Sequence, residues 1–261
     1  EGRVMDHQKA FIKCFEAFGP KHNRYQVISD FALFGASALH NAVAFSQELE
    51  DDYLRTTKRY DRDELSRHAE LLGTVVAGLE AGGEDFLGQA FMALELGNDR
   101  AGQFFTPWHV SKMMAQISLN GARSNLADEF VTLSEPACGA GGMVVAFAEI
   151  MREAGHNSQR QLWVQAWDID PLPARLCYIQ LALLHIPGEI VIGDTLRYEA
   201  RQVMRTPAHY LGFWDAKLRR RQEHQTAALV TQESAKPATS LAPAQCASTV
   251  PAADQQFQFD F

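Results

Sequence analysis

Apolar side chains recur at helical spacing through residues 1–97, and no strand-like alternation competes with that pattern. Four helices are expected there: one ended by Gly19-Pro20, one capped by Ser29-Asp30, one over about Asp61–Gly82 and one over about Asp85–Leu96. The sequence therefore predicts a helical domain over residues 1–97.

The next segment, residues 98–225, alternates short apolar runs with helical patterns and is expected to form a second domain. A helix is expected from Pro107, with Thr106 as its N-cap. Strands are expected at Val131–Glu135, Leu162–Trp167 and Glu189–Ile192, and the helices between them at Met143–Glu153 and Pro171–His185. This order is typical of a parallel sheet with right-handed crossovers, so the predicted fold class is α/β. No convincing fourth strand follows Asp194. From residue 226 to residue 261 the chain is rich in Ala, Pro, Ser, Thr and Gln, which predicts a disordered tail.

Composition is that of a soluble globular protein, with 46% hydrophobic and 21% charged residues. The longest uncharged stretch, Phe31 to Gln47, contains His40 and Asn41, so it is interpreted as a buried helix and no membrane span is expected. The four cysteines form no CxxC pair, and no secretory signal opens the chain. We therefore expect no disulfide framework, no metal site and a reducing, cytoplasmic compartment.

The net charge of −8 fits poorly with a protein that wraps nucleic acid over its whole surface. A local basic patch stays compatible with this value, because charge distribution matters more than the sum. The basic run from Lys217 to Arg221 is a candidate for phosphate contacts, with a solvated helix end as the alternative.

The strongest candidate site is the glycine-rich segment Glu135-Pro136-Ala137-Cys138-Gly139-Ala140-Gly141-Gly142, between a predicted strand and a predicted helix. Glycines in such a turn let the backbone approach a ligand closely and leave the helix N-terminus facing it. The spacing is GxGG rather than GxGxxG, so a dinucleotide is not the expected ligand. A tight turn without a ligand is the alternative, and Cys138 is interpreted as a small loop residue rather than a nucleophile.

Acidic residues stand at the ends of three successive predicted strands: Glu135, Asp168 and Asp194. Ligands of open parallel sheets bind outside the carboxyl ends of the strands, where a carboxylate can accept hydrogen bonds from ribose hydroxyls. Taken alone, Asp168 is equally well explained as a capping or solvated residue, and Asp194 is better explained as a turn residue. Together the three acids indicate a ligand that contains a nucleoside.

Two motifs together resemble the S-adenosylmethionine site of adenine-N6 DNA methyltransferases, and most closely the modification subunits of type I restriction systems. They are Gly102-Gln103-Phe104-Phe105-Thr106-Pro107 and the segment from Glu135 to Gly142. The family pattern reads GQ(F/Y)(F/Y)TP and then (D/E)PACG(T/S)GG. The resemblance covers about residues 60–197 and implies a helical domain followed by a truncated Rossmann-like methyltransferase sheet.

The resemblance implies S-adenosylmethionine as the cofactor and assigns it a place. The first motif would flank its methionine part, and Glu135 with the loop would hold its amino-acid end. Asp168 would bind the ribose, Ile169 would pack on the adenine ring and Asp194 would contact its amino edge. The residues implied to bind the cofactor are Phe105, Thr106, Pro107, Glu135, Ala137, Cys138, Gly139, Gly141, Gly142, Asp168, Ile169 and Asp194.

Family members also carry (N/D)PP(F/Y) after a fourth strand, where it holds and stacks on the flipped adenine. This chain has no Pro-Pro pair, and its nearest segment, Thr206–Tyr210, lacks the Asn, so no catalytic residue is assigned. Tyr210, Phe213 and Trp214 are candidates for stacking on a base or, alternatively, for anchoring the C-terminal helix to the core. Without the fourth strand, Val131–Glu135 keeps an open edge that invites pairing. We expect the segment after Thr195, an N-terminal helix or a partner subunit to cover it.

Three functions stay open on the sequence. The first is an adenine-N6 DNA methyltransferase of restriction-modification type. The second is a catalytically deficient, S-adenosylmethionine-binding accessory protein associated with DNA. The third, a nucleotide-dependent oxidoreductase, is disfavoured by the GxGG spacing. The expected partners are DNA, a specificity subunit or a second methylase subunit, and a sliding clamp, whose docking peptides the terminal segment Gln256–Phe261 resembles; chance is the alternative there.

Overall fold

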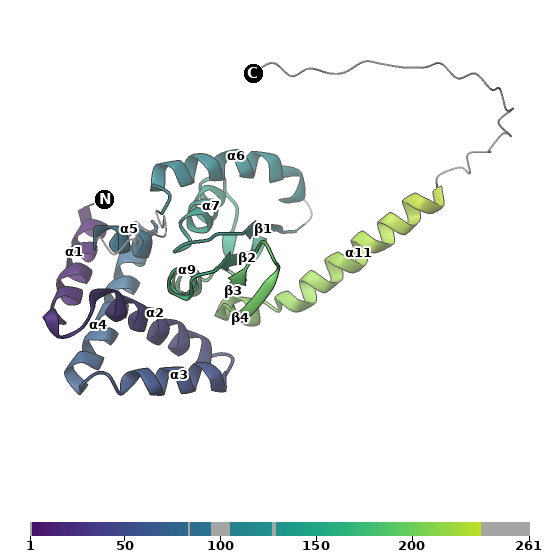
Figure 1. Ribbon diagram of the computed structural model, residues 1–261. Coiled ribbons are helices and arrows are strands. Elements are labelled where there is room, and N and C mark those ends of the chain that lie inside the picture. The colour runs from purple at the N-terminus through teal and green to yellow at the C-terminus, as the bar shows by residue number, and fades with distance from the viewer. Residues whose placement is uncertain (1, 83, 95–104, 127–128, 236–261) are drawn as a thin grey trace, which may run out of the picture. The chain divides into compact units, whose positions relative to one another are not determined.

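The computed structural model describes residues 2–82, 84–94, 105–126 and 129–235 (Figure 1). Residues 1–218 form one compact unit, and residues 219–261 are assigned to a second. The domain boundary that the sequence predicts at residue 97 stays a prediction.

The first unit begins with helices, as the apolar spacing predicted. Their bounds are α1 (Gly2–Glu16), η1 (Gly19–Lys21), α2 (Arg24–Asn41), α3 (Gln47–Thr57), α4 (Arg62–Gly82) and α5 (Phe86–Ala93). The predicted cap of the second helix is wrong, because the Asn23 side chain accepts a hydrogen bond from Gln26 N at 3.2 Å and starts α2 earlier. Asp30 lies inside α2, buried, and accepts hydrogen bonds from Arg59 and Tyr60.

Helix α3 was not expected from the sequence. Its sequence, QELEDDYLRTT, is mostly polar, and only Leu49 and Thr56 are buried. The Ser46 hydroxyl accepts a hydrogen bond from Leu49 N and caps the first turn, which carries the acidic residues that favour a helix N-terminus. A cap and a favourable charge pattern therefore form this helix without a clear apolar stripe.

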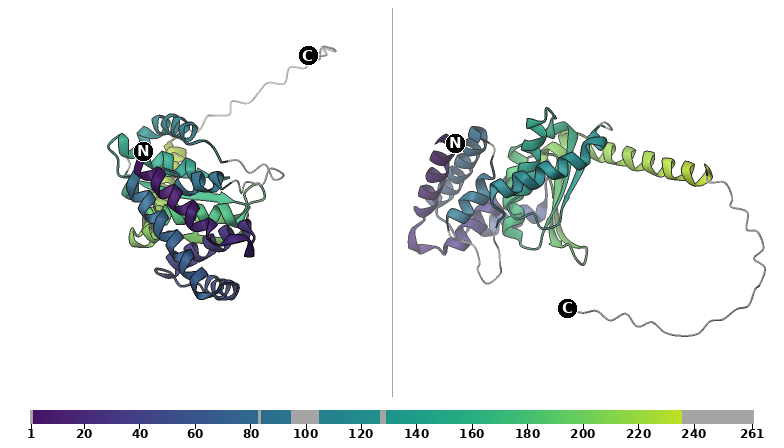
Figure 2. Two further views of the ribbon diagram at one scale, coloured as in Figure 1. Left: turned by 90° about the vertical axis from the view of Figure 1, so that its left-hand side faces the viewer. Right: turned by 90° about the horizontal axis from the view of Figure 1, so that it is seen from above.

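Aromatic residues join the N-terminal helices in one core. The ring of Phe11 packs edge-on against Phe31 of α2 at 5.7 Å and against Phe86 of α5 at 6.0 Å between centroids. Helix α2 lies against α9 (Pro171–Leu183), and Gly35 permits this approach, since a Cβ there would lie 2.8 Å from Ile179 Cδ1. Figure 2 shows the N-terminal helices gathered on one side of this unit and the strands on the other.

In the described part of the chain, the sheet has the strand order β1-β2-β3-β4. The strands are β1 (Val131–Glu135), β2 (Leu162–Asp168), β3 (Gly188–Asp194) and β4 (Glu199–Arg205). The first three are parallel, with α7 (Gly142–Glu153) and α9 in the connections, so the predicted α/β fold class is confirmed. The remaining helices are α6 (Trp108–Leu126), α8 (Ser158–Gln161), α10 (Pro207–Leu211) and α11 (Trp214–Ala235).

Strand β4 shows that the expectation of no strand after Asp194 was wrong. It pairs antiparallel with β3, from Glu189 opposite Arg205 to Asp194 opposite Glu199. The β4 sequence EARQVMR has Met204 as its one buried residue, so it lacks the regular alternation that marks a half-buried strand. Pairing with the free edge of β3, rather than its own apolar pattern, makes this segment a strand.

Strand β1 lies at the other end of the sheet, and no strand among the described residues pairs with its outer edge. Strand β4, which follows Thr195, does not cover that edge, because it pairs with β3 instead. Helix α6 packs near β1, and the Trp214 ring lies edge-on to Phe130 at 5.0 Å between centroids. Cover by a partner subunit stays a prediction.

Helix α11 includes residues 226–235, where the sequence predicted a disordered tail. Six of these ten residues are Ala, Leu, Gln or Glu, and these good helix formers extend a helix that is already nucleated. The rest of the predicted tail, with the Gln256–Phe261 peptide, lies outside the described residues. None of the described helices combines the length and the apolar character that a membrane span requires.

Candidate cofactor-binding site

The loop between β1 and α7 turns tightly through two glycines with left-handed backbone. Gly139 has a φ of +53° and Gly141 a φ of +96°, which other residues rarely adopt. Space is short as well, since a Cβ on Gly141 would lie 2.9 Å from Cys177 Sγ and one on Gly139 would lie 3.0 Å from the Phe105 ring. The glycine-rich loop thus brings the backbone itself against Phe105.

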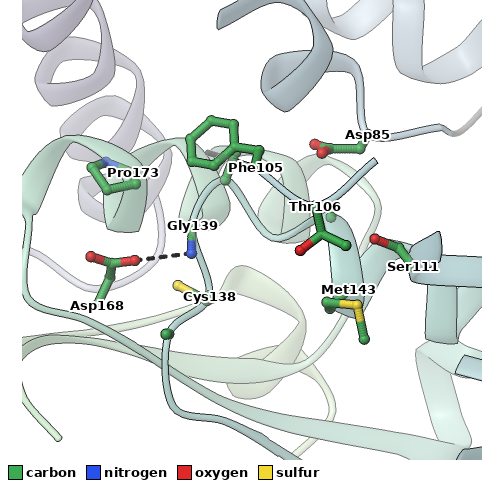
Figure 3. Close-up of a pocket in the computed structure, with 12 residues that line it drawn as sticks. Asp85, Phe105, Thr106, Ser111, Cys138, Gly139, Met143, Asp168 and Pro173 are labelled. Carbon is green, nitrogen blue, oxygen red and sulfur yellow. Dashed lines mark hydrogen bonds between the residues drawn. The ribbon is translucent and has the colours of Figure 1, made fainter. Parts of the chain in front are cut away.

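Asp168 ends β2 and holds the loop in place. One carboxylate oxygen accepts a hydrogen bond from Gly139 N at 2.9 Å (Figure 3). The other oxygen accepts one from Asp170 N, also at 2.9 Å. Burial raises the pKa of the Asp168 carboxyl above its ordinary value. Asp170 accepts from Leu172 N at 2.9 Å and caps α9, so the capping role considered for Asp168 belongs to its neighbour.

Both sequence motifs meet in one cavity of about 210 Å³. Its lining consists of Asp85, Phe105, Thr106, Ser111, Ala137, Cys138, Gly139, Ala140, Gly142, Met143, Asp168 and Pro173. The predicted site residues that the structure brings together here are Phe105, Thr106, Ala137, Cys138, Gly139, Gly142 and Asp168. Their roles toward a cofactor stay predictions.

The other predicted site residues do not line this cavity: Pro107, Glu135, Gly141, Ile169 and Asp194. The Glu135 carboxylate accepts a hydrogen bond from the backbone N–H two residues ahead at 3.2 Å, and burial raises its pKa. Asp194 accepts from the N–H groups two and three residues ahead, at 3.0 and 3.2 Å. Asp194 therefore has the geometry of a turn residue, which is the interpretation that the sequence favoured when this residue was considered alone.

Asp85 and Ser111 line the cavity and were not singled out from the sequence. Asp85 is the N-cap of α5, accepting from Gly88 N at 3.0 Å, and burial raises its pKa. The Ser111 hydroxyl on α6 is fully buried and has no hydrogen-bond partner among the described residues. The only sequence signal for Asp85 was a helix start, and Ser111 carried none, because neither belongs to a motif. Met143 and Pro173 complete the unpredicted lining, and Ala140 belongs to the loop that the sequence predicted to hold the cofactor.

Cys138 lies in the cavity wall without the environment of a nucleophile. A hydrogen bond with Cys177 and burial raise the pKa of its thiol well above the ordinary value. Cys14, Cys138 and Cys177 are free thiols. Within the described ranges, no group of three or more His, Cys, Asp and Glu side chains is placed to hold a metal ion.

The aromatic residues after β4 do not line this cavity. Trp214 is buried against Phe130, which anchors the start of α11 to the core, whereas Phe213 is exposed. The Lys217 ammonium lies 4.2 Å from the centroid of the Trp214 ring. Of the two roles considered for these aromatic residues, the anchoring role is confirmed for Trp214.

Comparison with known proteins gives one family match. A family model for N-6 DNA methylases matches residues 86–237, more than half of the chain. No curated protein matches significantly. Among solved structures, the chain is similar to a putative class I S-adenosylmethionine-dependent methyltransferase from Listeria monocytogenes, with 13% identity and a TM-score of 0.38, over 66% of this chain and 52% of that one. It is also similar to a type I restriction-modification methyltransferase subunit from Streptococcus thermophilus, with 13% identity and a TM-score of 0.34, over 70% and 56%. The chain thus spans about half the length of these two proteins.

Proposed function

The chain belongs to the N-6 DNA methylase family, and from this we propose that it is a DNA methyltransferase that acts on adenine N6 in a restriction-modification system. The cofactor of this family is S-adenosylmethionine. We place it in the cavity between Phe105, the glycine-rich loop and Asp168.

The observation that carries the proposal is that two motifs distant in the sequence line one cavity. Phe105 and Thr106 come from the first motif and the loop from Ala137 to Gly142 from the second. Features of the cavity fit a ligand: the Ser111 hydroxyl is buried without a partner among the described residues, and α7 begins at the cavity wall. The free N–H groups of a helix N-terminus favour an anionic group such as the cofactor carboxylate.

The bound cofactor would supply an electrophilic methyl group on a sulfonium sulfur. The chain's contribution would be to hold and orient it, because methyl transfer to an amine depends mainly on the alignment of donor and acceptor. Each Asp168 oxygen accepts one backbone hydrogen bond and retains a lone pair for a ribose hydroxyl. Phe105 lies against Gly139 and would exclude water from that side of the cofactor.

The group that binds the target amine is not assigned. The sequence contains no Pro-Pro pair, so the (N/D)PP(F/Y) motif is absent from this chain. We propose that a partner subunit supplies the contacts to the base and the DNA specificity. The unpaired outer edge of β1 offers a strand of such a partner a place to bind. A cofactor-binding accessory protein without transfer activity is the alternative that the missing motif supports.

Calorimetric titration with S-adenosylmethionine tests the cofactor site. We expect the intact chain to bind, and Asp168→Ala to weaken binding by about 10-fold or more. Glu199→Ala, an exposed position on β4, is the control and should bind like the intact chain. The proposal is wrong if the intact chain does not bind. Transfer of a tritiated methyl group to unmethylated DNA by the chain in complex with its partner subunit then separates the enzyme from the accessory protein.

A further inference from the structure

One end of the cavity is polar and is built by two helices that belong to neither sequence motif. Asp85 is the N-cap of α5 and Ser111 is the fourth residue of α6, and both line the cavity together with Asp168. In Figure 3, Asp85, Thr106 and Ser111 lie on one side of the view, and Asp168 and Pro173 lie on the other. The cavity therefore has a second polar end, opposite Asp168.

The Asp85 carboxylate is held by its neighbours in a fixed orientation. Oδ1 accepts hydrogen bonds from Gly88 N at 3.0 Å and from Gln180 Nε2 at 2.7 Å. Among the described residues, both hydrogen bonds to the carboxylate are therefore accepted by Oδ1. Oδ2 lies beside Gly142, and a Cβ added to Gly142 would lie 2.6 Å from this oxygen. One oxygen thus fixes the side chain and the other is directed to the start of α7, at the cavity.

The charge of Asp85 is not balanced by a cationic side chain. The side chain is buried, and the described Lys, Arg and His residues form no ion pair with it. A buried carboxylate without a counter-ion is costly, which is reflected in its raised pKa. A cationic group on a ligand would supply the missing charge.

Ser111 is an independent sign of a ligand at the same end. Its side chain is 0% exposed, and its hydroxyl has no hydrogen-bond partner in the described part of the chain. A buried hydroxyl left unpaired costs free energy, and native proteins rarely keep one. A ligand atom that accepts a hydrogen bond would satisfy it.

We propose that Asp85 and Ser111 bind the amino-acid end of S-adenosylmethionine. Asp85 accepts a hydrogen bond from the α-ammonium group, and Ser111 donates one to the α-carboxylate. This rests on the proposed function and makes the orientation of the cofactor explicit, with the nucleoside at Asp168 and the methionine zwitterion at Asp85. The motif resemblance assigned that end to Glu135 and the glycine-rich loop, and the proposal adds Asp85 and Ser111 as ligands.

Two ligands that differ only in the amino-acid chain test the assignment. S-adenosylhomocysteine carries the ammonium and carboxylate groups, and 5′-methylthioadenosine lacks both. Titrations use the full chain, Asp85→Asn, Ser111→Ala and the matched control Asp63→Asn, an exposed position in the first turn of α4. Asn keeps Oδ1, so the bonds to Gly88 and Gln180 are retained. The charge is lost, and an amide NH2 group that cannot accept a hydrogen bond from the ammonium replaces Oδ2.

We expect Asp85→Asn to weaken S-adenosylhomocysteine about 10- to 100-fold and Ser111→Ala to weaken it about 3- to 10-fold. Both variants should bind 5′-methylthioadenosine like the intact chain, which also shows that the site is folded. Equal losses for both ligands, or no loss for S-adenosylhomocysteine, would overturn the assignment while leaving the proposed function standing. An intact chain that binds neither ligand would overturn both.

Discussion

The Gln180 side chain donates a hydrogen bond of 2.7 Å to Asp85, a residue 95 positions away. The same amide nitrogen donates to Ala140 O at 2.7 Å, and the amide oxygen accepts from Leu87 N at 3.1 Å. Gln180 is fully buried. One side chain on α9 thereby joins the start of α5 to the glycine-rich loop and shapes the cavity from behind.

Gln180→Leu should destabilise the protein and weaken cofactor binding together. The substitution leaves the buried groups of Asp85, Ala140 and Leu87 without these partners, at a cost of about 2–3 kcal/mol in the free energy of unfolding. Urea unfolding measures the loss. Gln47→Leu, an exposed site on α3, is the control, with an expected change within about 0.5 kcal/mol. Equal stability of the two variants would show that the buried network contributes nothing.

Gly142→Ala tests the space beside Asp85. The added Cβ would lie 2.6 Å from Asp85 Oδ2, so the carboxylate must shift from its position at the cavity. We expect S-adenosylhomocysteine affinity to fall about 10-fold, the value of one charged hydrogen bond. Calorimetric titration measures it.

Gly73→Ala is the matched control for that substitution. It lies inside α4, and a Cβ there meets nothing within 4 Å. This variant should keep the affinity and gain about 0.5–1 kcal/mol in the free energy of unfolding, because Ala is the better helix former. Unchanged affinity in Gly142→Ala would mean that the Asp85 carboxylate can move freely.

Asp85→Asn should raise thermal stability at neutral pH. Because burial raises the pKa of Asp85 in the folded protein, its ionised form opposes folding. The protonated carboxyl contributes to the stability of the fold. This contribution is complete at pH values below the pKa of Asp in the unfolded state, about 3.9, and is lost as pH rises through the pKa of Asp85 in the folded state. The Tm difference between the variant and the intact chain should therefore grow from acid to neutral pH. A difference that is constant with pH would exclude a titrating Asp85 as its cause.

His68 should make the helical layer sensitive to acid. Its ring is buried among Phe18, Phe34 and Tyr60, both ring nitrogens lack a partner among the described residues, and burial lowers its pKa from 6.5 to about 4. Because the pKa of His68 is lower in the folded state than in the unfolded state, its stabilising contribution is complete at pH values above the unfolded pKa. As pH falls from about 6.5 to about 4, the free energy of unfolding decreases by about 3 kcal/mol.

The variant His68→Phe should lose this pH dependence. Urea unfolding at pH 7 and pH 5 measures it, with His109→Phe, an exposed histidine on α6, as the control that retains it. An identical pH response of His68→Phe and the intact chain would assign the acid sensitivity to other groups.

The sequence by itself predicted the elements whose signals are local. The parallel strands β1, β2 and β3 and the helices between them follow from apolar runs and capping residues, because such patterns act over a few neighbouring residues. The glycine-rich loop was identified in the same way, since a left-handed turn requires glycine at Gly139 and Gly141 wherever the rest of the chain lies. Family membership followed from two such local motifs.

Only the tertiary structure decided which side chains share the cavity with them. Asp85 and Ser111 belong to no motif, and packing of α5 and α6 brings them to the cavity. Packing of α9 brings Gln180 behind it, where it contacts Asp85 and the loop. Strand β4 has the same origin, because the edge of β3 supplies the pairing that its polar sequence does not announce. Contacts between distant segments depend on how whole elements pack, and a local pattern carries no information about that.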